Sequence, residues 1–236
     1  MILGIETSAQ LCGVGLCRRD GTLVASAQLD LPRSHARALA PLIRTLLDAA
    51  KIAPTDLEAV AVSAGPGSYT GLRIGASMAK GLAFAADAAL VSLPTLHVLA
   101  QAAAQQMTHE STILASLKSR RHEVYIAQFH SSGDQLTLVQ PDAALLLGEF
   151  ETWLEHTDHP IVLAGDANAV LAEHLARLGI VAKASWAPGD LDLPRHVAQL
   201  GAQAFEAGDT VDVGVFEPAY LKPVHAVRGR SVFERL

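Results

Sequence analysis

The chain has 236 residues, a formal net charge of −6 at pH 7, 50% hydrophobic residues and 18% charged residues. This composition is typical of a folded protein with a sizeable core and excludes an intrinsically disordered chain. The net negative charge also argues against the broad basic surface of proteins that bind nucleic acid directly. Two short basic clusters are therefore interpreted as solvated charges: Lys118, Arg120 and Arg121, and Lys222, Arg228 and Arg230.

The first hundred residues alternate between strand-like and helix-like segments. Strands are predicted at 2–6, 11–18 and 22–29, with Asp20-Gly21 as a two-residue hairpin turn. A helix is predicted over 34–51, capped by Ser34, because apolar residues recur at helical spacing. A strand ending at Ala64, a glycine-rich loop, a helix over 72–86, a strand at 89–92 and a helix over 95–107 complete this part.

A similar order then repeats. Strands are predicted at 113–117, 123–130 and 135–139, followed by a helix at 149–156, a strand at 161–164 and a helix at 167–178. A last helix is predicted over 195–207. The duplicated βββαβα plan predicts an α/β fold of two related lobes. We expect residues 1–100 to form the first lobe, residues 101–192 a smaller second lobe, and residues 193–236 a C-terminal helix and tail that pack back on the lobes.

The most specific motif is the run Gly65-Pro66-Gly67-Ser68-Tyr69-Thr70-Gly71-Leu72-Arg73-Ile74-Gly75. It joins a strand to a helix, and such a turn gathers free backbone N–H groups that favour an anion or a closely packed backbone. The run contains no P-loop lysine, and its glycine spacing differs from the dinucleotide-binding pattern. Packing within the fold is the alternative explanation of the glycines.

This motif, the opening Ile2-Leu3-Gly4-Ile5-Glu6-Thr7-Ser8 and the later Pro218-Ala219-Tyr220-Leu221-Lys222 resemble the TsaB (YeaZ) family. That family is the non-catalytic partner of TsaD in making threonylcarbamoyladenosine on tRNA. The resemblance implies the fold of the actin-like, sugar-kinase-like ATPases (ASKHA, RNase H-like). Two departures from the family pattern are Arg37, where an acid is usual, and Lys118, where an aspartate is frequent.

The sequence lacks the side-chain patterns of a catalyst. TsaD is a family with a His-x-x-x-His helix motif, but no two of the ten histidines here are four residues apart. His156 and His159 are three apart, just before a proline, and are interpreted as part of a surface loop. No Gly-x-Ser-x-Gly nucleophile motif occurs, and neither cysteine has a catalytic signature. We therefore expect no catalytic residue, no metal site and no cofactor.

A nucleotide or anion site is the alternative. The first hairpin would supply Glu6, Thr7 and Ser8, and the glycine loop would supply Gly65, Gly67 and Ser68. These residues would make the chain a stand-alone actin-like ATPase or a small-molecule kinase. The competing interpretation of Glu6 is a polar residue at a strand end that is hydrogen-bonded to nearby amides.

The two helices of the first lobe are the expected partner surface. Glycine inside a helix costs about 1 kcal/mol relative to alanine, so Gly75 and Gly81 suggest close approach of another backbone, in the chain's own sheet or in a partner. The resemblance implies that these helices bundle with a TsaD-like subunit, or with a second copy in a homodimer. The expected interface residues are His35, Leu39, Leu42, Ile43, Leu46, Leu72, Arg73, Gly75, Ala76, Ala79 and Lys80.

Leucine at position 75 or 79 is predicted to abolish the heterodimer without disturbing the fold. The resemblance further implies that a TsaE-like ATPase binds the heterodimer, and we expect tRNA to be reached only indirectly, through the complex. The two cysteines cannot form a disulfide framework, and the sequence shows neither a secretory signal nor a membrane-spanning run. The expected location is the cytoplasm, with no membrane partner.

Overall fold

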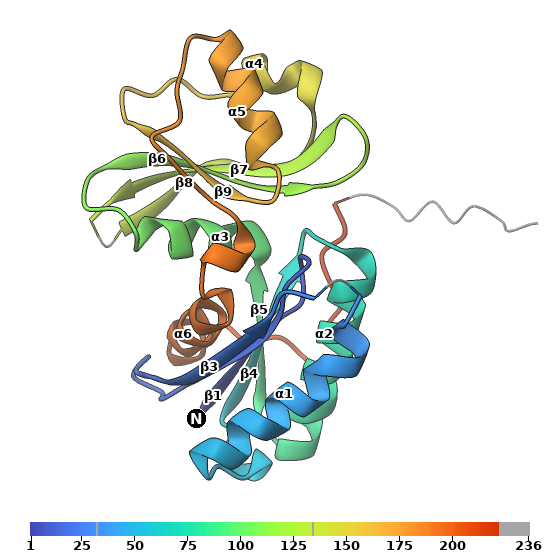
Figure 1. Ribbon diagram of the computed structural model, residues 1–236. Coiled ribbons are helices and arrows are strands. Elements are labelled where there is room, and N and C mark those ends of the chain that lie inside the picture. Colours follow the sequence, from blue (N-terminus) through green and yellow to red (C-terminus); the bar gives the residue numbers. More distant parts are fainter. Residues whose placement is uncertain (32, 134, 222–236) are drawn as a thin grey trace, which may run out of the picture.

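The computed structural model describes residues 1–31, 33–133 and 135–221, and it contains two lobes that each enclose a five-stranded sheet (Figure 1). In the first sheet the strand order is β3-β2-β1-β4-β5. β1 pairs antiparallel with β2 and parallel with β4. The strands of this sheet are β1 (Ile2–Glu6), β2 (Cys12–Cys17), β3 (Leu23–Leu29), β4 (Ala59–Gly65) and β5 (Ala89–Pro94).

The second sheet repeats the plan of the first. Its order is β10-β9-β6-β7-β8, and its central strand β6 again pairs antiparallel with β7 and parallel with β9. The strands are β6 (Ser111–Lys118), β7 (Glu123–Ser132), β8 (Gln135–Leu146), β9 (Ile161–Gly165) and β10 (Ala184–Trp186). The matching order confirms the predicted α/β fold of two related lobes.

The helices form layers on both sides of the sheets. α1 (His35–Ala50) and α2 (Tyr69–Ala86) cover one face of the first sheet. α3 (Thr95–Ala104) and α6 (Leu193–Glu206) cover the opposite face, and α3 also packs against the second sheet. α4 (Phe150–Trp153) and α5 (Asn168–Arg177) lie over the outer face of the second sheet (Figure 1). The remaining helical segments are the 3₁₀ turns η1 (Pro54–Asp56), η2 (Leu147–Glu149) and η3 (Pro188–Asp190).

Helix α6 lies in backbone contact with the first sheet. A Cβ atom on Gly15 would be 2.2 Å from the carbonyl oxygen of Pro194, and one on Gly4 would be 2.4 Å from the amide nitrogen of Ala198. Only glycine permits this approach. The buried cluster that includes Val197 of α6 also contains Phe129 of the second sheet, so one hydrophobic core extends through both lobes.

Several predicted details were wrong. Ser34 occupies the start of α1, but its hydroxyl donates to the carbonyl of Leu31 (2.7 Å) and does not cap the helix. The turn after β2 is longer than Asp20-Gly21, since the Arg18 amide donates to the carbonyl of Thr22 (2.9 Å). α2 begins at Tyr69 because the Ser68 hydroxyl accepts from the Gly71 amide. The helix predicted over 149–156 is shorter, since only α4 is α-helical there and the chain is irregular from 154 onward, and β10 was not predicted.

Candidate functional site

The glycine loop is packed tightly against the turn between β1 and β2. The Ser68 amide donates to the carbonyl of Ser8 (2.7 Å), and the Thr7 hydroxyl donates to the carbonyl of Gly71 (2.9 Å). A Cβ atom on Gly71 would lie 2.1 Å from the carbonyl oxygen of Thr7, and one on Gly67 would lie 2.3 Å from that of Ser8. These glycines are therefore required for packing within the chain.

Glu6 is fully buried beneath this loop. One carboxylate oxygen accepts hydrogen bonds from the Ser8 amide (2.6 Å) and the Ser8 hydroxyl (2.5 Å), and the other accepts from the hydroxyl of Ser63. Burial raises the pKa of Glu6, while the hydrogen bonds from Ser63 and Ser8 oppose that rise. The carboxylate fixes the turn and does not line the cleft described below, which agrees with the structural interpretation of Glu6.

Gly65 lies under the C-terminal segment and does not line the cleft described below. Its φ angle is +120°, and a Cβ atom would be 2.4 Å from the carbonyl oxygen of Ala219. The Ala219 amide donates to the carbonyl of Ala64 (2.7 Å), and the ring of Tyr220 lies 5.2 Å from that of Tyr69. The motif ending at Leu221 thus packs on the glycine loop. Lys222 lies outside the described residues, as do Arg228 and Arg230.

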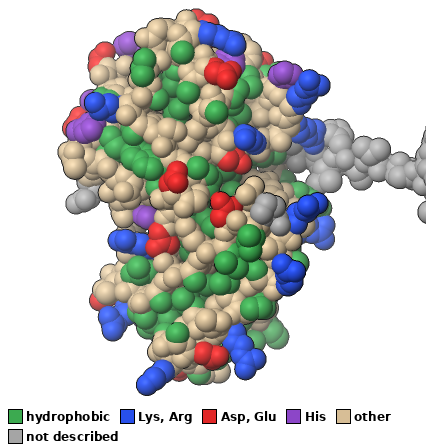
Figure 2. Space-filling model, viewed as in Figure 1, with side chains coloured by type: hydrophobic (Ala, Val, Ile, Leu, Met, Phe, Trp, Pro, Cys, Tyr) green, Lys and Arg blue, Asp and Glu red, His purple; other side chains and the backbone are tan. Residues whose placement is uncertain are grey.

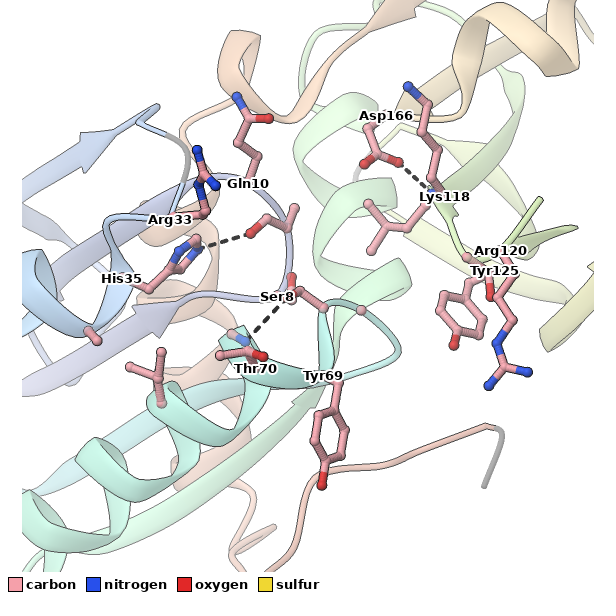
Figure 3. A pocket seen from close by; sticks show the side chains of 18 residues that line it. Ser8, Gln10, Arg33, His35, Tyr69, Thr70, Lys118, Arg120, Tyr125 and Asp166 are labelled. Carbon is pink, nitrogen blue, oxygen red and sulfur yellow. Dashed lines mark hydrogen bonds between the residues drawn. The ribbon is translucent and has the colours of Figure 1, made fainter. Parts of the chain in front are cut away.

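A cleft of about 700 Å³ separates the two lobes beside the first turn of α2 (Figure 3). Of the six predicted nucleotide or anion residues, Ser8, Gly67 and Ser68 line it, whereas Glu6, Thr7 and Gly65 do not. The other lining residues are Ala9, Gln10, Arg33, His35, Ala36, Tyr69, Thr70, Gly71, Ile74, Leu117, Lys118, Ser119, Arg120, Tyr125 and Asp166.

The charges around the cleft are mostly positive. Arg33, Lys118 and Arg120 contribute three cations against the carboxylate of Asp166. Asp166 accepts a hydrogen bond from the Lys118 amide (2.6 Å), and burial raises the pKa of the Asp166 carboxyl. The cleft is thus suited to an anionic group, and two of its cations come from the basic cluster that was interpreted as solvated.

His35 supports the wall of this cleft. Its Nε2 lies 3.0 Å from the carbonyl oxygen of Ala9 and 3.1 Å from that of Leu11. The imidazole therefore holds the β1–β2 turn against the start of α1. Its side chain is buried, so it serves the fold at this position.

A second surface runs along the outer face of α2. It is a groove lined by Ala36, Tyr69, Thr70, Arg73, Ile74, Ser77, Met78, Gly81 and Leu82. A Cβ atom on Gly81 would meet no atom within 4 Å, so the groove is open at that point. Figure 2 shows hydrophobic side chains gathered over this part of the first lobe. We call this surface the α2 groove.

Most of the predicted interface residues face the chain's own core. The buried ones are His35, Leu39, Ile43, Leu46, Leu72, Gly75, Ala76 and Ala79. Most of these side chains pack within the chain, because the apolar stripe of a surface helix lies against the sheet beneath it. Leu42 is half-buried against the same core. Arg73 lines the α2 groove, and Lys80 donates to the carbonyls of Phe216 (3.0 Å) and Gly214 (3.4 Å).

Leucine at position 75 or 79 would therefore test the stability of the fold and not the binding of a partner. A Cβ atom on Gly75 would lie 2.2 Å from the Thr7 hydroxyl oxygen, and Ala79 is fully buried. Leucine at either position would disturb the fold, contrary to the prediction. The groove residues that were missed carry a recognisable signal, since Ile74, Met78 and Leu82 recur every four residues beside the buried stripe.

Comparisons with known proteins identify the family of the chain. The family model for tRNA N6-adenosine threonylcarbamoyltransferase (TsaD) matches residues 30–177. The tRNA threonylcarbamoyladenosine biosynthesis protein TsaB of Bacillus subtilis is 30% identical over 226 residues, which are 95% of each chain. TsaB of Escherichia coli is 30% identical over 224 residues, or 94% of each chain.

The fold agrees with these sequence matches. The solved structure of YeaZ from Pseudomonas aeruginosa superposes with a TM-score of 0.78 at 26% identity, covering 93% of this chain and 99% of that one. Among the described residues, no helix is long and apolar enough to cross a bilayer. The similarity extends over nearly the full length of the chain, which belongs to the TsaB (YeaZ) family of tRNA threonylcarbamoyladenosine biosynthesis proteins.

Proposed function

We propose that the chain is a non-catalytic accessory subunit that forms a heterodimer with a TsaD-like enzyme. The enzyme would transfer the threonylcarbamoyl group to N6 of the adenosine next to the anticodon of tRNA. A TsaE-like ATPase would bind the heterodimer, the tRNA would contact the complex and not this chain alone, and the free chain would form a homodimer. The cytoplasm, where tRNA is modified, is the corresponding location.

The open α2 groove is the observation that carries this proposal. Its floor combines the half-buried Ile74, Met78 and Leu82 with the open position at Gly81. Aromatic residues, methionine and arginine are enriched at protein interfaces, and Tyr69, Met78 and Arg73 stand together here. A helix of the partner that lies in the groove would cover apolar surface that the chain itself leaves exposed.

The accessory role would consist of holding the enzyme in its competent state. Such an effect requires that the chain bind that state more tightly than the others. The hydrogen bonds of Glu6 support a non-catalytic role. Both of its carboxylate oxygens already accept hydrogen bonds from Ser8 and Ser63, so neither is directed at a substrate.

The alternative is a stand-alone ATPase or small-molecule kinase. It is favoured by the cations Arg33, Lys118 and Arg120, which line the cleft beside the first turn of α2. Under this alternative the isolated chain would bind and hydrolyse ATP, and charge removal in Lys118→Ala and Arg120→Ala together would abolish binding.

Reconstitution tests the proposal. TsaD, TsaE, the adenylate-forming enzyme, ATP, bicarbonate, threonine and unmodified tRNA are combined with and without the chain, and modified adenosine is quantified. We expect product only when the chain is present. Equal product without the chain would refute the accessory role, and ATP turnover by the chain alone would then support the alternative.

A pair of variants tests the surface. Ser77→Arg places a long cation in the α2 groove at an exposed position, whereas Ala172→Arg places the same group on exposed α5 of the second lobe. We expect Ser77→Arg to remain folded, to lose co-elution with TsaD and to lose product formation, while Ala172→Arg retains both. Unchanged co-elution of Ser77→Arg would show that the enzyme binds elsewhere.

A further inference from the structure

Three potential metal ligands meet at one end of the second sheet. They are Glu110, His130 and His159, and one donor atom from each lies within 4.8 Å of the others. His159 Nδ1 is 3.7 Å from Glu110 Oε2, and the two imidazole rings have centroids 4.5 Å apart. Neither the accessory role nor the interlobe cleft uses these side chains.

The strands fix the three residues relative to one another. His130 of β7 lies opposite Thr112 of β6 in the antiparallel register, and Glu110 directly precedes β6. His159 lies just before β9, whose first residue, Ile161, is paired with Thr112 in the parallel register. The three ligands therefore lie in or directly next to three neighbouring strands, at the same end of the sheet.

The loop that carries His159 is tied to β6. The Thr112 amide donates to the carbonyl of Pro160 (2.9 Å), and the Thr112 and Thr157 hydroxyl oxygens lie 2.6 Å apart. The His159 amide also donates to the Thr157 hydroxyl (3.1 Å). This loop is thus held in place by the fold and not by the histidine ring, which leaves the imidazole available as a ligand.

The carboxylate has the outer support that metal ligands require. The Ser132 hydroxyl donates to Glu110 Oε1 (2.8 Å), and Oε2 is the oxygen directed toward His159. Hydrogen bonds of this kind orient ligating carboxylates and commonly affect metal affinity by about 10- to 100-fold. The cluster therefore contains an oriented carboxylate beside two imidazoles.

We propose that Glu110, His130 and His159 form a binding site for a divalent transition metal, with Zn²⁺ as the preferred ion. Two imidazoles and one carboxylate are a ligand set that suits Zn²⁺, at metal–ligand distances of about 2.0–2.2 Å. Binding would require the three donor atoms, which lie within 4.8 Å of one another, to close to that distance around the ion, with water as the fourth ligand. Mg²⁺ and Ca²⁺, which prefer oxygen ligands, are excluded by the histidines.

The proposed ion would link β6, β7 and the loop before β9. Lys118, which lines the cleft, is the last residue of β6, about 23 Å along the strand from its first residue at the rise of an extended chain. The site therefore lies at the opposite end of β6 from the cleft, and it shares no residue with the α2 groove. Its role is to stabilise the second lobe when the metal is bound.

Metal titration of the full chain without a histidine tag tests the site. Calorimetry with Zn²⁺ is expected to show one saturable site, and the melting temperature in excess Zn²⁺ is expected to exceed that in EDTA. Affinity should fall by more than about tenfold in His130→Ala and in His159→Ala. Mg²⁺ should produce neither heat of binding nor a shift in melting temperature.

His109→Ala is the matched control, because His109 is an exposed histidine next to Glu110 that lies outside the cluster. It should bind Zn²⁺ as the unaltered chain does. Circular dichroism in EDTA checks the fold of each variant, and Glu110→Gln, at an exposed position, replaces any histidine variant that does not fold. Absence of a saturable site, or equal affinity in the cluster variants and the control, would overturn the proposal.

Discussion

Two glycines of the same helix have opposite structural roles. Gly71 faces the carbonyl oxygen of Thr7, where a Cβ atom would be only 2.1 Å away, and Gly81 faces open space. Glycine is the poorest ordinary helix former, so its presence at either position lowers helix propensity. Only the contact at Gly71 offsets that cost within the chain, while Gly81 remains available to a partner.

Alanine at these two positions should therefore have opposite effects. Gly71→Ala is expected to lower the free energy of unfolding by about 1–3 kcal/mol, because the methyl group meets backbone. Gly81→Ala is expected to raise it by about 0.5–1 kcal/mol through helix propensity. Urea denaturation measures both values. A loss of stability in Gly81→Ala would show that the position is not open.

Glu6 makes stability depend on pH. Because burial raises its pKa, the folded chain keeps the Glu6 proton to a higher pH than the unfolded chain does. Above about pH 4.3, the ordinary value for glutamate, the folded state thus binds more protons, and this group's contribution to stability falls as pH rises toward the folded pKa.

Glu6→Gln removes this titration. The free energy of unfolding of the variant, relative to that of the unaltered chain, should increase as pH rises above about 4.3 and should level off once the pH exceeds the raised folded pKa of Glu6. Urea denaturation at a series of pH values measures the difference. A difference that is constant with pH would mean that the Glu6 pKa is not raised by burial.

Individual elements were predictable where one strong pattern determined them. The spacing from Leu39 to Leu47 identified α1, and the glycine-rich turn located the end of β4. The three-residue β10 is too short to show a period, and its place is set by pairing with β9. The Ser34 cap was wrong because its hydroxyl donates to the carbonyl of Leu31 and accepts from no amide of the first turn of α1, a rotamer choice that residue type alone does not determine.

The segment after α6 acts as a strap on the first lobe. Phe216 is 7% exposed and joins the core beneath α1 and α2, and its carbonyl accepts from the Lys80 ammonium (3.0 Å). Val211 forms an isolated bridge with Leu90 of β5. The sequence of this segment has no strand or helix periodicity, so its packing against the first lobe could not be predicted from the sequence.

Truncation of the buried Phe216 side chain should weaken the packing of this segment and lower the free energy of unfolding. Phe216→Ala is expected to cost about 3 kcal/mol, within the range for large-to-small core substitutions. Val215→Ala, one residue earlier and 78% exposed, should change stability by less than about 0.5 kcal/mol. Equal effects of the two substitutions in urea denaturation would show that Phe216 does not anchor the segment.

At the scale of the whole molecule, the sites depend on how separate segments meet. The repeated strand order was predictable from the duplicated pattern, but the cleft needs Ser68 of one lobe beside Lys118 of the other. Likewise, Glu110, His130 and His159 are distant in sequence and meet only through the registers of β6, β7 and β9. Periodicity also identifies an apolar stripe without stating whether it faces the core, which explains why most of the expected interface residues are buried.

The shared core should make the two lobes unfold together. One buried cluster contains Ile2 of β1, Leu99 of α3 and Phe129 of β7, and α3 packs on both sheets. Both tryptophans, Trp153 and Trp186, belong to the second lobe, so their fluorescence reports on that lobe, whereas far-ultraviolet circular dichroism reports on both. Coincident transitions by the two probes are the signature of a single cooperative unit.

A substitution confined to one lobe provides the test. Leu3→Ala, at a fully buried position of β1, is expected to cost about 2–5 kcal/mol and to shift the fluorescence and dichroism midpoints equally. Leu163→Ala in β9 of the second lobe, buried beneath α5, should likewise shift the fluorescence and dichroism midpoints equally. If Leu3→Ala shifted the dichroism transition and left the tryptophan transition in place, the lobes would be independent units, and the contacts of α3 and α6 would not be sufficient to couple them.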